Sequence, residues 1–358
     1  MKLVVFGLSV SSSWGNGHAT LWRGLIGALA ALGHTVVFFE RDVPYYAAHR
    51  DLDALPGGRL VLYPTWDAAR AAARAELAGA DVAIVTSYCP DALAAAAEVL
   101  DAPSPLRIFY DLDTPVTLDR LRAGEAVPYI GSDGLGDYDL VLSYTGGAAL
   151  TALRERLGAR RVAPLYGSVD PVVHRRVPPV DRYRCDLSYL GTYAADRQEA
   201  LARMLVEPAR RLAARRFLVA GAQYPADFPW ADNIYFVRHL PPSEHPAFYS
   251  SSRLTLNVTR APMAEMGFCP SGRLFEAAAC GVPLASDAWA GLEEFFAPGS
   301  EILLIRTPDD AIRAIEADDA ELSRVARAAR DRVLTDHSAE RRAGQLLTLL
   351  EGVLAVEA

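Results

Sequence analysis

Short apolar runs alternate with helical segments along almost the whole chain of 358 residues. Residues 2–8 form a continuous apolar run, helical periodicity follows over 19–32, and a second apolar run covers 35–39. A further helical segment is expected from Trp66 to Leu77. Strands that are apolar on both faces are typical of a parallel sheet covered by helices. The alternation therefore predicts βαβ units and a doubly wound α/β fold.

The alternation stops once and then starts again. The stretch that interrupts it is rich in Pro and Arg and carries no apolar period, which is typical of a connection between domains. The chain is also about two and a half times as long as the commonest domain of roughly 150 residues. We therefore expect a first Rossmann-like domain over 1–170, a linker over 171–185, a second Rossmann-like domain over 186–320, and C-terminal helices over 321–358 that pack across the domains.

The composition narrows the class of protein. Hydrophobic residues make up 51% and charged residues 22%, which is typical of a soluble globular chain. The formal charge of −8 argues against an extended basic surface for nucleic acid, although it is compatible with a local anion site. The chain has no uninterrupted apolar stretch of about 18 residues, which is the length that would predict a transmembrane segment. The apolar run at the N-terminus is too short for a signal peptide. We expect a cytoplasmic protein.

The cysteines give no sign of a metal site or a disulfide framework. Cys89, Cys185, Cys269 and Cys280 lie far apart, and only the last two are near each other in sequence. Neither zinc-ligand spacing nor a paired pattern is present, so the sequence predicts buried thiols in a reducing compartment and no metal.

The segment 267–283 carries the most informative motif. Ser271 is typical of a helix N-cap, Gly281 of the residue after a helix, and Pro283 cannot continue one, so a helix of about ten residues is expected between them. Free amides and the positive end of the helix dipole favour a phosphate at such an N-terminus. Arg273 in the first turn adds a guanidinium that can bind a phosphate through two hydrogen bonds.

Gly272, Arg273 and Glu276 share one face of this expected helix. Apolar residues flank Glu276, and a carboxylate that is buried among them needs partners. The vicinal hydroxyls of a sugar are one such partner. The alternative is a capped core helix in which Glu276 forms a salt bridge.

Four segments of the chain resemble the CgeB-like, spore-maturation-type glycosyltransferases, which are similar to the group 1 glycosyltransferases of GT-B fold. The resemblance covers nearly the whole chain, and its last segment is the most specific. The segments are Tyr110–Pro115, Leu190–Tyr193, Asn257–Arg260 and Pro270–Pro283.

This resemblance implies a GT-B architecture, with two facing Rossmann-like domains that hold the nucleotide-sugar mainly in the second domain and the acceptor in the first. It also implies that Glu276 binds the nucleotide ribose, and that Ser271, Gly272 and Arg273 contact the diphosphate. Group 1 enzymes commonly have another glutamate at the position of Phe268. Because this chain departs from them there, inversion or retention at the sugar stays open.

Further contacts with the nucleotide-sugar donor are expected near the start of the second domain. Gly191 and Thr192 stand at the end of an expected strand, and Arg197 follows in the next helical segment, from which it can reach a phosphate. Arg260 follows another strand end and is a second candidate for the diphosphate. The alternative for these arginines is simple exposure to solvent.

The nucleotide base is expected near His239 and Leu240, in the region where similar enzymes bind the base through backbone groups. Side chains there do not indicate which base is bound, and UDP and dTDP are the expected carriers. The resemblance implies no added cofactor, because GT-B donors are generally held by arginines and helix dipoles without a metal.

In the first domain, the loop 11–18 joins the first strand to the first helix. Its two glycines, Gly15 and Gly17, allow close approach of a ligand, and His18 would project into the interdomain cleft. GT-B enzymes similar to this chain often use a histidine in this loop as the base that deprotonates the acceptor hydroxyl. The alternative is a histidine that only caps the helix or lies at the surface.

Asp111 and Asp113 end another expected strand. Their spacing is compatible with Mg²⁺, but they lie in the expected acceptor domain, so acceptor binding or orientation of His18 is the preferred interpretation. A plain turn closed by Thr114 and Pro115 is the alternative.

The resulting hypothesis is a glycosyltransferase that moves a sugar from a nucleoside-diphosphate sugar to a hydroxyl-bearing acceptor. A GT-B sugar epimerase or phosphorylase, or a catalytically inactive nucleotide-sugar-binding protein, stays open as an alternative. A nicotinamide-dependent oxidoreductase is disfavoured, although Glu40 follows a strand as in a dinucleotide-binding domain, because the glycines after the first strand do not have the required spacing.

Overall fold

The computed structural model describes residues 1–103 and 105–357, and the chain forms two compact units. The first unit comprises Met1–Tyr166 together with the chain from Ala339 onward, and the second comprises Gly167–Ser338. Each unit is an α/β fold with one parallel sheet, as the alternation of apolar runs predicts. The last two helices divide between the units, since α13 (Asp319–Asp336) belongs to the second and α14 (Ala339–Glu357) to the first.

The sheet of the first unit has seven parallel strands in the order β3-β2-β1-β4-β5-β6-β7. The strands are β1 (Lys2–Gly7), β2 (Thr35–Arg41), β3 (Gly58–Tyr63), β4 (Val82–Thr86), β5 (Leu106–Asp111), β6 (Leu140–Ser143) and β7 (Val162–Pro164). Besides α14, its helices are α1 (His18–Ala31), α2 (Pro44–Ala47), α3 (Trp66–Leu77), α4 (Ala92–Asp101), α5 (Thr114–Arg122) and α6 (Ala148–Leu157).

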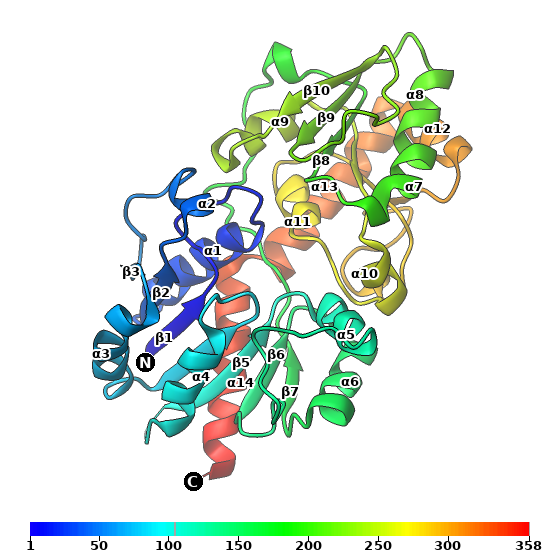
Figure 1. Cartoon of the computed structure of the whole chain (residues 1–358). Helices are drawn as coiled ribbons and strands as arrows, with labels where there is room; N and C mark the ends of the chain where they lie inside the picture. The colour runs from blue at the N-terminus through cyan, green and yellow to red at the C-terminus, as the bar shows by residue number, and fades with distance from the viewer. Residues whose placement is uncertain (104, 358) are drawn as a thin grey trace. The chain divides into compact units, whose positions relative to one another are not determined.

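Helices cover both faces of this sheet, which explains why its strands are apolar throughout. Val4 and Phe6 of β1 pack in a cluster with buried residues of α3, α4 and α6. Leu3 and Val5 belong to the cluster on the opposite face, together with residues of α1 and α14. Figure 1 shows these two helices beside the sheet. Successive strand residues alternate between faces, so a continuous apolar run is buried on both sides.

The sheet of the second unit has six parallel strands in the order β10-β9-β8-β11-β12-β13. The strands are β8 (Leu187–Leu190), β9 (Phe217–Gly221), β10 (Ile234–Arg238), β11 (Thr255–Asn257), β12 (Leu284–Ser286) and β13 (Leu303–Leu304). Besides α13, its helices are α7 (Gln198–Leu201), α8 (Glu207–Arg211), α9 (His245–Ser251), α10 (Ala261–Met266), α11 (Gly272–Ala279) and α12 (Pro308–Glu316), with a π-helical turn over Ala202–Val206 between α7 and α8.

In both sheets the strand order reverses beside the first strand, at β1 and β4 in one unit and at β8 and β11 in the other. Loops diverge at such a reversal and leave a crevice at the carboxyl ends of the strands, where α/β proteins bind ligands. The fold therefore brings the loops after β1, β4 and β5 together in the first unit. It brings those after β8, β9 and β11 together in the second.

The stretch expected to be a linker is held by hydrogen bonds to α9. The backbone N–H of Val177 donates to Ser250, and that of Val180 donates to Ser251, at 3.1 and 2.8 Å. Just before these residues, the N–H of His174 donates to the carbonyl of Asp170 in a tight turn. This stretch lies within the second unit and delivers a histidine to its interior.

Within the described residues, no helix combines the length and the apolar character needed to cross a membrane.

Candidate functional site

At the carboxyl edge of the first sheet, the structure brings together the three side chains that the sequence assigns to catalysis. His18 is the first residue of α1, and its backbone N–H donates to Oδ1 of Asn16 at 3.1 Å. Nε2 of His18 lies 3.9 Å from Oδ2 of Asp113, which precedes α5. Both side chains are partly exposed, so a ligand hydroxyl can reach them.

Asp111 ends β5 and lies behind this pair, fully buried. Its Oδ1 accepts hydrogen bonds from the backbone N–H of Asp113 and from the hydroxyl of Thr117, both at 3.1 Å. Burial raises the pKa of Asp111 to about 6, and the neighbouring charge of Asp113 adds to the increase, while the hydrogen bonds oppose it. Asp111 is thus a buried carboxyl that fixes the turn carrying Asp113, and it is not exposed to a substrate.

Tyr88 joins this group from the loop after β4, and sequence reasoning missed it. Its ring centroid lies 6.2 Å from that of His18 and 5.2 Å from that of Tyr129. Burial raises the pKa of Tyr88, and the charge of Asp113 and a hydrogen bond to its carboxylate contribute.

The backbone of Tyr88 has a φ of 64°, a left-handed conformation that is uncommon for a residue with a large side chain. Gln223 and His239 share this conformation, and each of the three lies within two residues of the carboxyl end of a strand. Strained backbone of this kind is concentrated at functional sites. The left-handed backbone at these three residues therefore marks the carboxyl edge of each sheet.

Glu40 at the end of β2 has a structural role. Its two carboxylate oxygens accept hydrogen bonds from the hydroxyl of Ser9, the backbone N–H of Val10, and both the N–H and the hydroxyl of Ser11. The side chain is fully buried and holds the loop after β1. It is therefore not free to bind the ribose of a dinucleotide, which agrees with the unsuitable glycine spacing.

At the carboxyl edge of the second sheet, three arginines gather. Burial lowers the pKa of Arg197, and the nearby charges of Arg273 and Arg260 lower it further, while Tyr189 and Asp196 oppose the change. Nη1 of Arg197 donates to the carbonyl of Thr192 at 3.1 Å, but its buried Nε has no hydrogen-bond partner among the described residues.

A balancing anion is only partly supplied by the protein itself. Nε of Arg260 donates to Oδ2 of Asp196 at 3.0 Å. Asp196 is also the acidic residue whose charge opposes the lowering of the pKa of Arg197. Three guanidinium groups with so little negative charge beside them have the charge and the hydrogen-bond donors that an anion requires.

Arg273 is oriented by its neighbours. Its Nη1 donates to Oδ1 of Asn257 at 2.9 Å, and its guanidinium carbon lies 5.5 Å from the ring centroid of Tyr189. A Cβ atom at Gly191 would lie 2.8 Å from the hydroxyl of Tyr189 and 3.0 Å from Nη2 of Arg273. A larger residue at this position, directly after β8, would therefore displace the side chain of Tyr189 or Arg273.

The helix expected around Gly272–Cys280 forms as α11, and Gly281 follows it with a φ of 75°, as the sequence predicts. Ser271 stands at the N-cap position with extended backbone, but its hydroxyl makes no capping hydrogen bond. The first-turn N–H groups are thus left without a side-chain cap, beside Arg273. Phe268, at the position of the glutamate in group 1 enzymes, has a φ of 49° and donates its N–H to the carbonyl of Ala290.

Glu276 lies one turn further along α11, between two histidines that the sequence did not single out. Nε2 of His174 is 3.8 Å from Oε1 of Glu276, and Nδ1 of His245 is 3.5 Å from Oε2. The side chain of His174 is 3% exposed, and burial lowers its pKa. One ligand-type atom from each of the three residues lies within 4.8 Å of the others, so this trio is the group among the described residues with the chemistry to hold a metal ion.

The segment expected to bind the nucleotide base lies next to this trio. Nε2 of His245 is 3.3 Å from the carbonyl oxygen of the buried Leu240, and His239 donates its backbone N–H to the carbonyl of Gly221 at the end of β9. The expected donor residues thus form two groups within one unit. Gly191, Thr192, Ser271 and Gly272 lie beside the cluster of Arg197, Arg260 and Arg273. Leu240 and Glu276 contact His245, and His239 directly precedes Leu240 in the chain.

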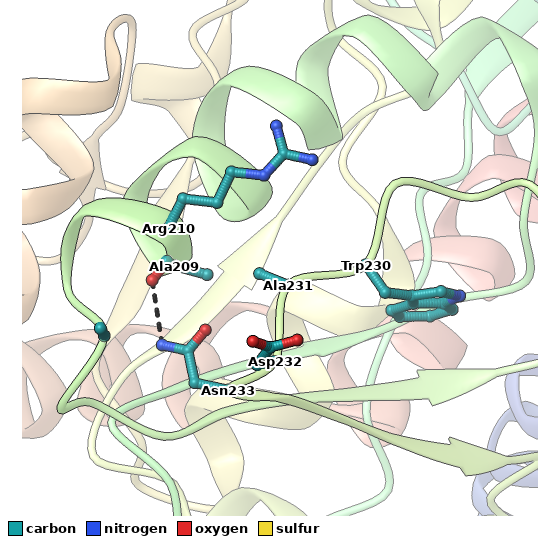
Figure 2. A pocket seen from close by; sticks show the side chains of 7 residues that line it. Ala209, Arg210, Trp230, Ala231, Asp232 and Asn233 are labelled. Carbon is teal, nitrogen blue, oxygen red and sulfur yellow. Dashed lines mark hydrogen bonds between the residues drawn. The ribbon is translucent and has the colours of Figure 1, made fainter.

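A cavity of about 330 Å³ lies elsewhere in the second unit (Figure 2). It is lined by residues such as Arg210, Trp230 and Asp232, and Asn233 beside them donates to the carbonyl of Ala209. Asn233 directly precedes β10, so the cavity is at the amino end of that strand. This is the opposite end from the arginines, and the cavity contains none of the expected site residues.

Part of the chain matches a known protein family. Residues 197–348 match the glycosyl transferase-like family, and this range includes α11 and all three arginines. No curated protein matches the sequence.

Solved structures show that the chain has the GT-B fold. It is similar to sucrose-phosphate synthase from Thermosynechococcus elongatus, with a TM-score of 0.70 and 17% identity over 99% of this chain and 100% of the other. It is also similar to Anabaena HepE in complex with UDP-glucose, with a TM-score of 0.66 and 13% identity over 98% and 100% of the two chains. An alpha-glucosyltransferase in complex with UDP-glucose and DNA matches with a TM-score of 0.69 and 12% identity over 98% and 99%.

Proposed function

We propose that the protein is a glycosyltransferase that moves a sugar from a nucleoside-diphosphate sugar to a hydroxyl-bearing acceptor. The cluster of Arg197, Arg260 and Arg273 beside the uncapped start of α11 is the observation that carries this proposal. A diphosphate matches it in charge and in its need for hydrogen-bond donors. The family match over 197–348 and the CgeB-like motifs support the same conclusion.

In this proposal the second unit binds the donor. The three arginines and the N–H groups at the start of α11 hold the diphosphate, and Glu276 binds the ribose. UDP is the proposed carrier, because the solved complexes of similar fold contain UDP or UDP-glucose. The arginines stabilise the negative charge that develops on the diphosphate as the bond between the sugar and its phosphate oxygen breaks.

The first unit activates the acceptor in this proposal. His18 takes the proton from the acceptor hydroxyl, and the oxygen then forms the new bond to the sugar. Asp113, 3.9 Å from His18, orients the imidazole and stabilises its protonated form. Asp111 fixes the turn on which Asp113 lies. No added cofactor is proposed.

A thermal-shift screen of the full chain against nucleoside diphosphates tests the donor site. A nucleotide at 100 times its dissociation constant adds about 2.7 kcal/mol to the stability of the native state, so a clear rise in melting temperature is expected for at least one of them. Absence of any shift over the panel would contradict the proposed donor site.

Product analysis with the matching nucleotide-sugar then tests the reaction. Transfer to an acceptor releases the nucleoside diphosphate and yields a new glycoside. An altered sugar that is still attached to the nucleotide would indicate an epimerase instead, and binding without turnover over a broad acceptor panel would indicate an inactive binding protein.

A further inference from the structure

Strand β10 forms one edge of the second sheet and exposes two adjacent aromatic side chains. It has five residues, whereas the edge strands β7 and β13 have three and two. The side chains of Tyr235 and Phe236 are 49% and 40% exposed, and Leu62, at 39%, is the exposed large apolar side chain of the remaining edge strand, β3. A strand at the edge of a sheet can pair with a strand of another chain.

The backbone groups of β10 point to its two sides in turn. Asn233 and His239 both form hydrogen bonds with β9, the first through its carbonyl and the second through its N–H. Because the hydrogen-bonding direction alternates along a strand, Ile234, Phe236 and Arg238 direct their backbone groups away from β9. The N–H of Ile234 donates within the preceding turn, but the outward groups of Phe236 and Arg238 have no hydrogen-bond partner in the part of the chain that the structure describes.

These outward groups are complementary to those of a second copy of the chain. In an antiparallel pair centred on Phe236, the N–H and the carbonyl of Phe236 bond to the same groups of Phe236 in the second copy. The N–H of Arg238 then faces the carbonyl of Ile234 in the second copy, and the two-fold axis repeats this bond. This register therefore pairs the outward donors and acceptors from the carbonyl of Ile234 to the N–H of Arg238.

The side chains fit the same register. Tyr235 lies opposite Val237 of the second copy, and such aromatic and β-branched pairs stabilise antiparallel sheets. Arg238 lies diagonally across from Asp232 of the second copy, a separation that a long side chain can span. Asp232 and Arg238 are both exposed, and neither forms an ion pair within the described residues. The two copies thus place opposite charges near each other at both ends of the strand pair.

We propose that β10 is the interface of a homodimer, in which two copies of this chain pair their β10 strands antiparallel about Phe236 and join their second sheets into one continuous sheet. A two-fold axis lets the same patch serve on both sides of the interface. The inference concerns assembly and does not rest on the proposed function. Because one short strand from each copy forms the contact, the interface is small, and we expect a dissociation constant in the micromolar range.

Analytical ultracentrifugation of the full chain over the micromolar range tests the proposal and should show a monomer–dimer equilibrium. Phe236→Lys should abolish the dimer, because residue 236 pairs with itself and two positive charges would then face each other. Leu62→Lys, at the edge of the other sheet and with nearly the same exposure, is the matched control and should dimerise as the wild type does. A monomer at every concentration would overturn the proposal and leave the edge to a strand of a different protein.

A second test leaves Phe236 in place, because its ring also packs against Tyr224 and Trp230, with centroids 5.2 and 5.1 Å away. Arg238→Asp brings like charges together and should weaken the dimer about 5- to 30-fold, since the two-fold axis applies the change twice. The double variant Asp232→Arg, Arg238→Asp exchanges the charges and should restore the affinity of the wild type. A dimer that persists in folded Phe236→Lys, or a double variant that dimerises no better than Arg238→Asp, would overturn the proposal.

Discussion

His18 and Asp113 face each other across 3.9 Å at the carboxyl edge of the first sheet. This distance is longer than a hydrogen bond, and both side chains are partly exposed. The backbone of each is fixed, since Asn16 accepts from the N–H of His18 and Asp111 accepts from the N–H of Asp113. A small rotation of either side chain would join them, which is the geometry that a base and its orienting carboxylate require.

Replacement of His18 by alanine should lower turnover about 10²- to 10⁴-fold, the usual worth of a general base, and leave donor affinity almost unchanged. Donor affinity should hold because the residues proposed to bind the donor belong to the second unit. Steady-state kinetics and calorimetry with the donor nucleotide measure the two effects. His34→Ala, at a histidine that contacts the N-terminal amine, is the matched control and should retain full turnover. A proportional loss of affinity and rate would make His18 a binding residue.

Asp111→Asn should make the protein more stable, and more so at pH 7.5 than at pH 4.5. The folded pKa of Asp111 is raised from 3.8 to about 6, so the folded state holds the proton more tightly than the unfolded state, and stability is lost as the pH rises from about 4 to about 6. The gain from asparagine should therefore be about 2 kcal/mol larger at pH 7.5. Urea unfolding at both pH values measures it. Asp133→Asn, at an exposed aspartate, serves as the control. An equal gain in stability at both pH values in Asp111→Asn would show that the raised pKa of Asp111 is not its cause.

Arg197→Met should raise the stability of the ligand-free protein and reduce its stabilisation by pyrophosphate. Burial and the adjacent arginines lower the pKa of Arg197, so its charge opposes folding until an anion binds. Melting temperatures with and without pyrophosphate provide the measurement. Arg211→Met, at a more exposed arginine paired with Asp309, should show the response of the wild type. An unaltered pyrophosphate response in Arg197→Met would exclude this arginine from the anion site.

Glu276→Ala should weaken nucleoside-diphosphate binding by about 1.5 to 3 kcal/mol, the range for hydrogen bonds to a charged group, which is roughly 10- to 100-fold. The fold should persist, because α11 is held by its buried apolar face. Calorimetry gives the dissociation constant. Glu265→Ala, at an exposed glutamate of α10, should bind as the wild type does. If Glu276→Ala left the constant unchanged, the ribose would have to be bound elsewhere.

Turnover should need no added divalent cation, because three arginines and the start of α11 supply the positive charge for the leaving diphosphate. Activity should thus persist largely intact after treatment with EDTA. Complete loss of activity that Mg²⁺ or Mn²⁺ restores would contradict this prediction.

Local sequence determined the order of the strands and helices and their approximate ends. The apolar run at β1 predicts burial on both faces, and the structure places Val4 and Phe6 on one face and Leu3 and Val5 on the other. Helix α3 begins and ends where the pattern predicts, at Trp66 and Leu77. These features depend on periodicity and on residues only a few positions apart, and such short-range information is contained in the sequence itself.

Tertiary structure decided which side chains meet. His174, His245 and Glu276 come from a connecting turn, the start of α9 and the middle of α11, and no spacing in the sequence links them. Tyr88 likewise joins His18 only because β4 pairs beside β1. The order of strands in a sheet brings distant loops to one edge, and the register and rotamers there set distances of a few ångströms. Burial periodicity does not contain that information, so the group of His174, His245 and Glu276 is visible only in the folded chain.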